Sequence, residues 1–247
     1  MDDLQADSRV ITSPQAEYDS LRYVSPEFAC PYLPGLLART ESYSIDHLEG
    51  ARYEALMDRG FRRSGQVVYR PRCRFCTACR PIRVLTDRFS PSRSMRRVRR
   101  RNTELAVEIG SPGATSEKLA LFRRYLAAKH DDRMDRGAEA FSDFLCDSPT
   151  NTLEFRYRLK ERMVAVSVAD RCPGGISSVY VYFDPDFAAR SLGTFSALWE
   201  IDYCRSERLP YYYLGYYVEG SRTMAYKARF RPCQILTVEH EWVLFRE

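Results

Sequence analysis

The chain has 247 residues, of which 45% are hydrophobic and 29% charged, and its formal net charge is +5 at pH 7. This composition excludes a largely disordered chain and is ample for a buried core. No apolar run approaches the roughly 20 residues that a membrane helix needs, and the start, MDDLQADSRVITSPQ, lacks the basic flank and apolar centre of a secretory signal. We therefore expect a cytoplasmic protein whose eight cysteines need not form disulfides.

The first 112 residues divide into two parts. Residues 1–22 are polar and without a pattern, which predicts a mobile tail. Residues 23–112 hold two turn-rich stretches, CPYLPG and RPRCRFCTACRP, around a helical pattern at 47–58. We expect here a small irregular domain that contains the cysteines, followed by a basic helix at 93–102 and a strand at 105–109.

The basic helix is the densest charge in the chain. Four arginines are predicted on one face, and Met95 and Val98 on the inward side. Arginine forks match phosphate oxygens, so the run favours a nucleic acid partner, although an ordinary solvated helix face gives the same pattern. The candidate contacts to nucleic acid are Arg93, Arg96, Arg97 and Arg100.

Residues 113–247 are more regular. Helical patterns at 118–129 and 138–145 precede three strand-like runs at 152–159, 163–169 and 176–183, whose short connections imply an antiparallel meander. A helix at 191–206 and a strand at 211–217 follow. This order matches the fold of the coenzyme A-dependent N-acetyltransferases (GNAT), in which the last meander strand and the strand after the helix splay apart around the acyl donor. We therefore predict an α+β protein with a GNAT-like domain and a mainly antiparallel sheet.

Two short motifs suggest ligands. Arg190 and Gly193 flank a helix start, where free N–H groups attract phosphate, although an ordinary helix start looks the same. A C-x2-C-x2-C run and one distant cysteine are spaced to hold zinc or an iron-sulfur cluster, or are reduced structural thiols, because a standard ribbon has a second C-x2-C pair. The candidate metal ligands are Cys30, Cys73, Cys76 and Cys79.

Five segments together resemble one family. CPYLPG, GFRRSGQVVYRPRCRFCTACRPIRV, FSPSRSMRRVRRRN, YFDPDFAARSLGTFSALWEI and YYYLGYYVEGSRTMAYKARFRP are similar, in order, to signatures of the aminoacyl-tRNA-protein transferases. Leu33 in CPYLPG resembles the bacterial branch, which transfers leucine from leucyl-tRNA to N-terminal Asp or Glu and so marks proteins for degradation. Thr223 stands where the family usually has lysine, so one contact is either absent or supplied by Arg222.

The resemblance implies roles for several residues. Asp184 and Glu200 are the candidate catalytic carboxylates, although a solvated or capping role fits either residue equally well. No cofactor is needed because the ester of a charged tRNA is already activated. An acidic acceptor needs a cation, for which the candidates are Lys227, Arg229 and Arg83. On the aromatic strand, some tyrosines belong to the core and others bind substrate. The candidates there are Tyr213, Tyr216 and Tyr217.

Three alternatives remain at this point. The same fold transfers arginine in related enzymes, and a buried acid near the site would favour that donor. A coenzyme A-dependent acetyltransferase is disfavoured because only Gly193 is clear in the phosphate loop. A non-enzymatic nucleic-acid-binding module built on the cysteines leaves the second half of the chain unexplained.

Overall fold

A computed structural model describes residues 22–129 and 137–246. The predicted tail of residues 1–22 lies outside the described residues except for Arg22, which begins the first strand. In the part of the chain that is described, no helix has the length and apolarity to span a membrane.

The elements follow the chain in a mixed order. The helices are α1 (Gly50–Met57), α2 (Arg93–Arg101), α3 (Ser116–Lys129), α4 (Ala138–Leu145) and α5 (Leu192–Ser206), and the 3-10 helices are η2 (Pro185–Arg190) and η3 (Ala225–Arg229). The strands are β1 (Arg22–Val24), β2 (Phe28–Ala29), β3 (Leu37–Ala38), β4 (Thr40–Ser44), β5 (Arg62–Ser64), β6 (Val67–Pro71), β7 (Arg80–Leu85), β8 (Leu105–Gly110), β9 (Thr152–Leu159), β10 (Arg162–Cys172), β11 (Gly175–Phe183), β12 (Tyr211–Tyr217), β13 (Cys233–Leu236) and β14 (Trp242–Leu244).

One large sheet organises the molecule. Its strand order is β14-β13-β7-β12-β11-β10-β9-β8, and its described pairs are antiparallel except β11 with β12. The predicted α+β class, the mainly antiparallel sheet and the meander of β9, β10 and β11 are thus confirmed. Strands β7 and β8 precede residue 113 and yet pair within this sheet, while the predicted boundary between residues 112 and 113 stays a prediction.

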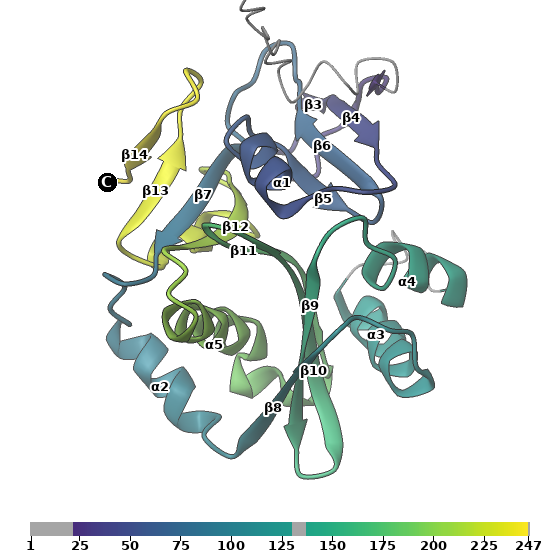
Figure 1. Ribbon diagram of the computed structural model, residues 1–247, viewed down its shortest axis with the longest axis vertical. Coiled ribbons are helices and arrows are strands. Elements are labelled where there is room, and N and C mark those ends of the chain that lie inside the picture. The colour runs from purple at the N-terminus through teal and green to yellow at the C-terminus, as the bar shows by residue number, and fades with distance from the viewer. Residues whose placement is uncertain (1–21, 130–136, 247) are drawn as a thin grey trace, which may run out of the picture.

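The N-terminal part contains more regular structure than its turn-rich sequence indicates. A second sheet, in the order β1-β4-β6-β5, packs with α1 at one end of the large sheet (Figure 1). Its core is built from aromatic and aliphatic side chains that are almost completely buried, including Tyr43, Tyr53, Leu56, Phe61 and Val68. Burial of such side chains supplies the main stabilisation of this small unit.

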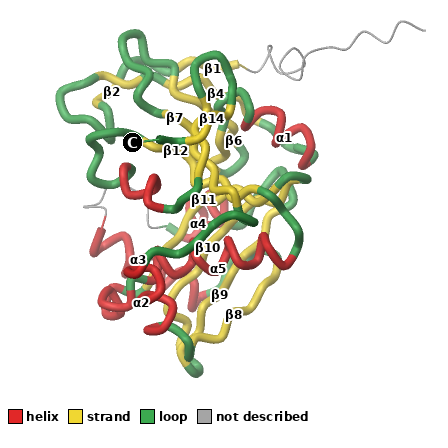
Figure 2. The backbone as a smooth tube through the Cα atoms, turned by 90° about the vertical axis from the view of Figure 1, so that its left-hand side faces the viewer, coloured by secondary structure: helices red, strands yellow, loops and turns green. Residues whose placement is uncertain are grey.

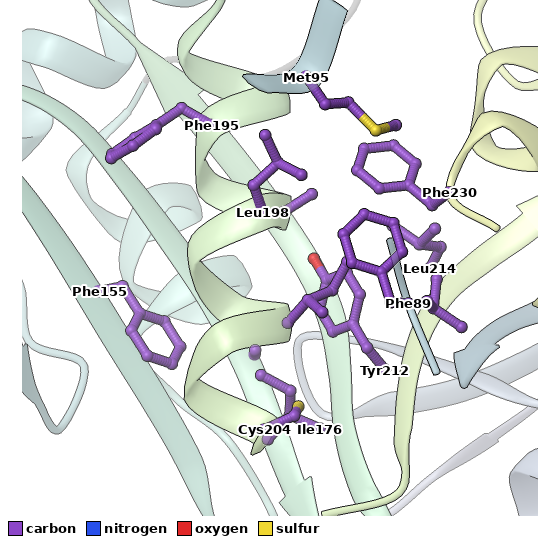
Figure 3. Close-up of a cluster of buried hydrophobic side chains, with 14 of the residues drawn as sticks. Phe89, Met95, Phe155, Ile176, Phe195, Leu198, Cys204, Tyr212, Leu214 and Phe230 are labelled. Carbon is purple, nitrogen blue, oxygen red and sulfur yellow. The ribbon is translucent and has the colours of Figure 1, made fainter. Parts of the chain in front are cut away.

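Helices cover both faces of the large sheet (Figures 1 and 2). On one face α5 packs with Met95 of α2, Phe89 and Phe230, as Figure 3 shows. On the other face α3 and α4 bury Phe122 and Phe141 against β10 and β11. Met95 is buried and Val98 packs on the same core, so the inward side of the basic helix is as predicted.

A buried ion pair joins the two sheets. Arg63 of β5 donates from Nε and Nη2 to the two carboxylate oxygens of Asp170 of β10, at 2.7 and 2.8 Å. Both side chains are 0% exposed, and Thr152 donates a further hydrogen bond of 2.6 Å to Asp170. Because the charges are removed from water, each depends on the other to remain buried.

We predict that Asp170→Asn lowers the free energy of unfolding by about 3 to 5 kcal/mol, because it leaves the Arg63 guanidinium buried without a counter-charge. Urea denaturation measures the change. The control is Asp202→Asn, which breaks a part-exposed pair with Arg99 and should cost less than about 1 kcal/mol. Equal effects of the two substitutions would contradict a structural role for the buried pair.

Candidate active site

The divergence of β11 and β12 creates the main cavity. The two strands pair in parallel only from Gly175 to Ser177 and from Tyr211 to Tyr213. Beyond this point β11 and β12 supply opposite walls of a cavity of about 630 Å³, which we call the splay cavity. The start of α5 adds Gly193, Ser196 and Ala197 to its wall. The predicted splay of the acyltransferase fold is therefore present.

A β-bulge shapes the β12 side of this cavity. The pairing of β12 with β7 shifts between Tyr213 and Gly215, and Gly215 has a φ of 84°. Left-handed backbone is cheap for glycine, and the shift interrupts the alternation of side chains along the strand. Tyr212 before the shift, and Leu214, Gly215 and Tyr216 at or beyond it, all line the splay cavity.

The N-terminal sheet closes the splay cavity from the other side. Arg62 of β5 and Tyr69 of β6 contribute to its lining, together with Tyr53 of the adjoining helix α1. Four basic side chains line the cavity, and among the described residues no aspartate or glutamate does. These four are Arg62, Arg63, Lys129 and Lys227.

Arg62 is the residue that sequence reasoning missed. Its side chain is 4% exposed, and Nη1 donates to the carbonyl oxygens of Phe61 and Met57 at 2.5 and 3.4 Å. Its Nε and Nη2 are buried and have no hydrogen-bond partner in the described structure. The motif GFRRSG contains it, but the sequence does not show which of the two arginines has a carboxylate partner.

Lys227 lines the same cavity from η3. Burial, and in second place the nearby positive charge of Arg62, together lower the pKa of its ammonium group to about 7. A Cβ on Gly215 would lie 3.4 Å from Lys227 Nζ, so the amine packs against the β12 backbone. Near neutral pH this lysine therefore exchanges its proton readily, which suits a proton acceptor better than the fixed cation expected from the sequence.

Glu200 lies behind the wall of the cavity. It is fully buried and accepts hydrogen bonds from Ser167, Ser196 and Tyr212 at 2.6, 3.2 and 2.8 Å. Burial raises the pKa of its carboxyl group. Only Ser196 and Tyr212 of this network line the cavity, so Glu200 is placed to orient these hydroxyl groups. Its predicted catalytic role stays a prediction.

Asp184, the other predicted carboxylate, lies outside the lining of the splay cavity. Its side chain accepts from the N–H of Asp186 at the start of η2 and forms ion pairs with Arg124 and Arg162 at 2.6 and 2.5 Å. These contacts give Asp184 a capping and ion-pairing role, which stabilises the helix start.

Four of the predicted substrate-binding residues also lie outside the splay cavity. Arg83 is stacked between Tyr211 and Trp242, at 3.6 and 4.2 Å from the ring centres. Tyr213 and Tyr217 belong to the two hydrophobic cores, and Arg229 is exposed at the end of η3. Of the six candidates only Tyr216 and Lys227 line the cavity.

The predicted phosphate contacts are spread over α2 and the start of α5. Arg93, Arg96, Arg97 and Arg100 are exposed, as expected for a binding face. Arg190 instead bonds Glu104 at 2.6 Å and the carbonyl of Arg101 at 2.8 Å. The Asn102 amide donates to the carbonyl of Arg190 at 2.9 Å, which ties the end of α2 to the start of α5 beside the splay cavity.

A second cavity, of about 440 Å³, contains the cysteines. Cys30, Cys73, Cys76 and Cys79 all line it, and it shares Pro31, Tyr32, Tyr69 and Tyr216 with the splay cavity. Burial raises the pKa of Cys79 to about 12, so its thiol is protonated in this arrangement. No group of three or more potential ligands in the described residues is arranged to hold a metal ion. Metal binding by this set stays a prediction.

Thr223, the departure from the family pattern, lies in the wall of the splay cavity, whereas Arg222 is exposed and does not line it. The hydroxyl of Thr223 lies 3.3 Å from that of Ser221. Thr223 therefore occupies a position from which a longer cationic side chain would reach the cavity, and the lining contains Lys227 and Arg62 in any case.

The splayed sheet, with a basic cavity between the diverging strands, has the arrangement of an acyltransferase fold. Residues 28–97 match the family described as "Arginine-tRNA-protein transferase, N terminus", and residues 117–237 match its C terminus. The chain belongs to the aminoacyl-tRNA-protein transferase family, on the branch of the bacterial aspartate/glutamate leucyltransferases, and is an aminoacyltransferase.

Curated relatives named aspartate/glutamate leucyltransferase support this assignment. The protein from Hahella chejuensis is 37% identical over 90% of this chain and 95% of its own length. The protein from Thiobacillus denitrificans is 41% identical over 89% of this chain and 92% of its own length. FemX, a solved structure, aligns over 88% of this chain and 86% of its own with 8% identity and a TM-score of 0.46, which is too loose to carry a functional argument.

We predict that Lys227→Met stabilises the fold near neutral pH by about 3 to 5 kcal/mol, the order of free energy that the lowered pKa represents, while reducing transfer. The usual pKa of lysine, 10.5, falls to about 7 in the folded protein. Between these values the unfolded chain binds the extra proton, so stability falls as pH decreases from 10.5 to 7. The increase in the free energy of unfolding caused by Lys227→Met should therefore be largest below pH 7 and should vanish above pH 10.5. A gain independent of pH would contradict the lowered pKa.

Proposed function

We propose that this protein transfers leucine from leucyl-tRNA to the amino group of proteins that begin with Asp or Glu. The product carries a new N-terminal leucine that marks it for degradation, and charged tRNA and acidic N-termini are the two partners. We place the reaction in the cytoplasm, where tRNAs are charged.

The charge of the splay cavity is the observation that favours leucine. Its lining contains four basic side chains and, among the described residues, no acid. A guanidinium donor would meet the positive charge of Arg62, which has no carboxylate partner among the described residues, and like charges in a partly dehydrated cavity repel strongly. Two buried acids lie behind the wall: Glu200 is covered by three hydroxyl donors, and Asp170 is paired with Arg63. The leucine side chain, by contrast, suits the aromatic surfaces of Tyr125 and Tyr180.

The transfer needs positioning and one proton acceptor. The acceptor nitrogen attacks the ester carbonyl, the new amide bond forms, and the ester C–O bond breaks to release the terminal hydroxyl of the tRNA. The proton lost by nitrogen is passed to the leaving ribose oxygen, which becomes that hydroxyl, so no nucleotide or redox partner is consumed. An α-amino group titrates near pH 8, and the amine of Lys227 suits the role of intermediate acceptor.

The arginines of α2 are the proposed contacts to the tRNA. The helix lies beside α5 (Figure 1), and its end is bonded to Arg190, just before the start of α5, where Gly193 and Ser196 line the splay cavity. An arginine row of this kind neutralises phosphates and binds independently of sequence. The terminal adenosine would then enter the cavity while the acceptor arm lies along α2.

We predict that labelled leucine passes from leucyl-tRNA to peptides beginning with Asp or Glu, and that arginyl-tRNA and acetyl-coenzyme A give no product. Peptides that begin with Ala or Lys serve as acceptor controls. The label in the isolated peptide is counted for each donor and acceptor pair. Transfer of arginine in preference to leucine would contradict the donor assignment, and no transfer from either tRNA would contradict the function.

A triple reversal, Arg96→Glu, Arg97→Glu and Arg100→Glu, should weaken tRNA binding by about 100-fold or more at low salt, because phosphate contacts become repulsions. Filter binding over a salt series measures both the affinity and the slope against salt. The double reversal of the exposed Lys160 and Arg208 to Glu is the control and should leave binding nearly unchanged. Unchanged affinity of the triple variant would exclude α2 from the tRNA interface.

A further inference from the structure

Arg62 is buried, and two nitrogens of its guanidinium group have no hydrogen-bond partner among the described residues. The Nε and Nη2 groups of a guanidinium form a planar fork that matches the two oxygens of a carboxylate. In Arg62 these two nitrogens are the ones without a partner among the described residues, whereas Nη1 is held by two backbone carbonyls. Unpaired buried donors are costly, so an anion that accepts from both would stabilise this residue strongly.

The neighbouring residue shows what such an anion looks like. Arg63 presents the same two nitrogens to Asp170 and is bound by both oxygens of the carboxylate. Arg22 and Arg70, in the same N-terminal sheet, bond the carboxylate of Glu41. Arg62 is thus the exception in its surroundings, and its side chain lies in the lining of the splay cavity.

The surroundings of Arg62 suit a small carboxylate better than a phosphodiester. Its Cζ atom lies 5.7 Å from the ring centre of Tyr216 and 5.9 Å from that of Tyr213, so aromatic groups limit the space and exclude water. A phosphodiester carries a nucleoside on each side, and the exposed arginines of α2 offer it an open surface instead. The side chain of Asp or Glu, in contrast, ends in a carboxylate only two or three carbons from the reacting α-carbon.

We infer that Arg62 is the specificity-determining residue for the acceptor, and that its Nε and Nη2 donate to both oxygens of the N-terminal Asp or Glu side chain. This inference rests on the proposed leucyl transfer. Lys227 lines the same cavity and is close enough for the two charges to influence each other. The α-amino group of an acidic residue lies only a few bonds from its side-chain carboxylate. A carboxylate bound by Arg62 therefore holds the α-amino group in the same cavity as Lys227.

The experiment compares peptides that differ only in charge at the first residue, Asp against Asn and Glu against Gln. The native enzyme should prefer the acidic peptides. Arg62→Gln should reduce kcat/KM for the Asp peptide by about 100-fold, as for the loss of one partner of a buried charge pair. The kcat/KM for the Asn peptide should change little, so the ratio of kcat/KM for the Asp peptide to that for the Asn peptide should fall by about the same 100-fold. A ratio that stays as in the native enzyme would overturn the inference.

Two further variants separate this role from a structural one. Arg205→Gln removes a part-buried arginine that donates to the carbonyl oxygen of Thr86 and does not line the cavity, and it should leave the Asp to Asn ratio unchanged. Arg62→Lys keeps the charge without the fork and should lower the ratio by about 10-fold; it decides the question if Arg62→Gln does not fold. Native enzyme that fails to transfer leucine at all would contradict the proposed function, whereas a native ratio in an active Arg62 variant contradicts only the assignment of Arg62.

Discussion

The short pairing of β11 with β12 is the constraint on which the site depends. The strands share a parallel register over three residue pairs and then diverge, so the sheet opens in its middle. The bulge at Gly215 and the start of α5 complete the walls of the opening. The buried pair of Arg63 and Asp170 fixes the N-terminal sheet over the opening, which brings Arg62 and Tyr69 into the lining of the cavity.

The exposed face of α2 and the splay cavity differ in how their positive charges are arranged. The exposed arginines of α2 form an open, strongly basic face that suits the repeated phosphates of a tRNA. The splay cavity holds fewer cations in a partly dehydrated space, where a single carboxylate is recognised and a cationic donor side chain is disfavoured. Glu200 does not line the cavity itself. It is linked to the cavity through Ser196 and Tyr212, whose hydroxyl groups donate to its carboxylate and which belong to the lining.

Local pattern predicted much of the second half of the chain. The bounds of β9 and β12 agree with the predicted runs at 152–159 and 211–217, because these strands are long and rich in β-formers. Local sequence pattern does not predict contacts between residues that are far apart in the chain. The partner of Arg63 lies 107 residues away, so nothing in GFRRSG separates Arg63 from Arg62. Strand alternation places Tyr212 and Tyr213 on opposite faces, but the sequence does not show that Tyr212 lines the splay cavity while Tyr213 packs in the core of the N-terminal sheet.

The central claim is that the ester and the acceptor amine meet in the splay cavity. A crystal structure with a non-hydrolysable leucyl-adenosine amide and a peptide beginning with Asp tests it most directly. The account predicts the leucyl group between β11 and β12, beside Ser196 and Tyr212, with the Asp carboxylate on Arg62. Density for the leucyl group in the cysteine-lined cavity, or for the peptide carboxylate away from Arg62 on an outer surface, would contradict it.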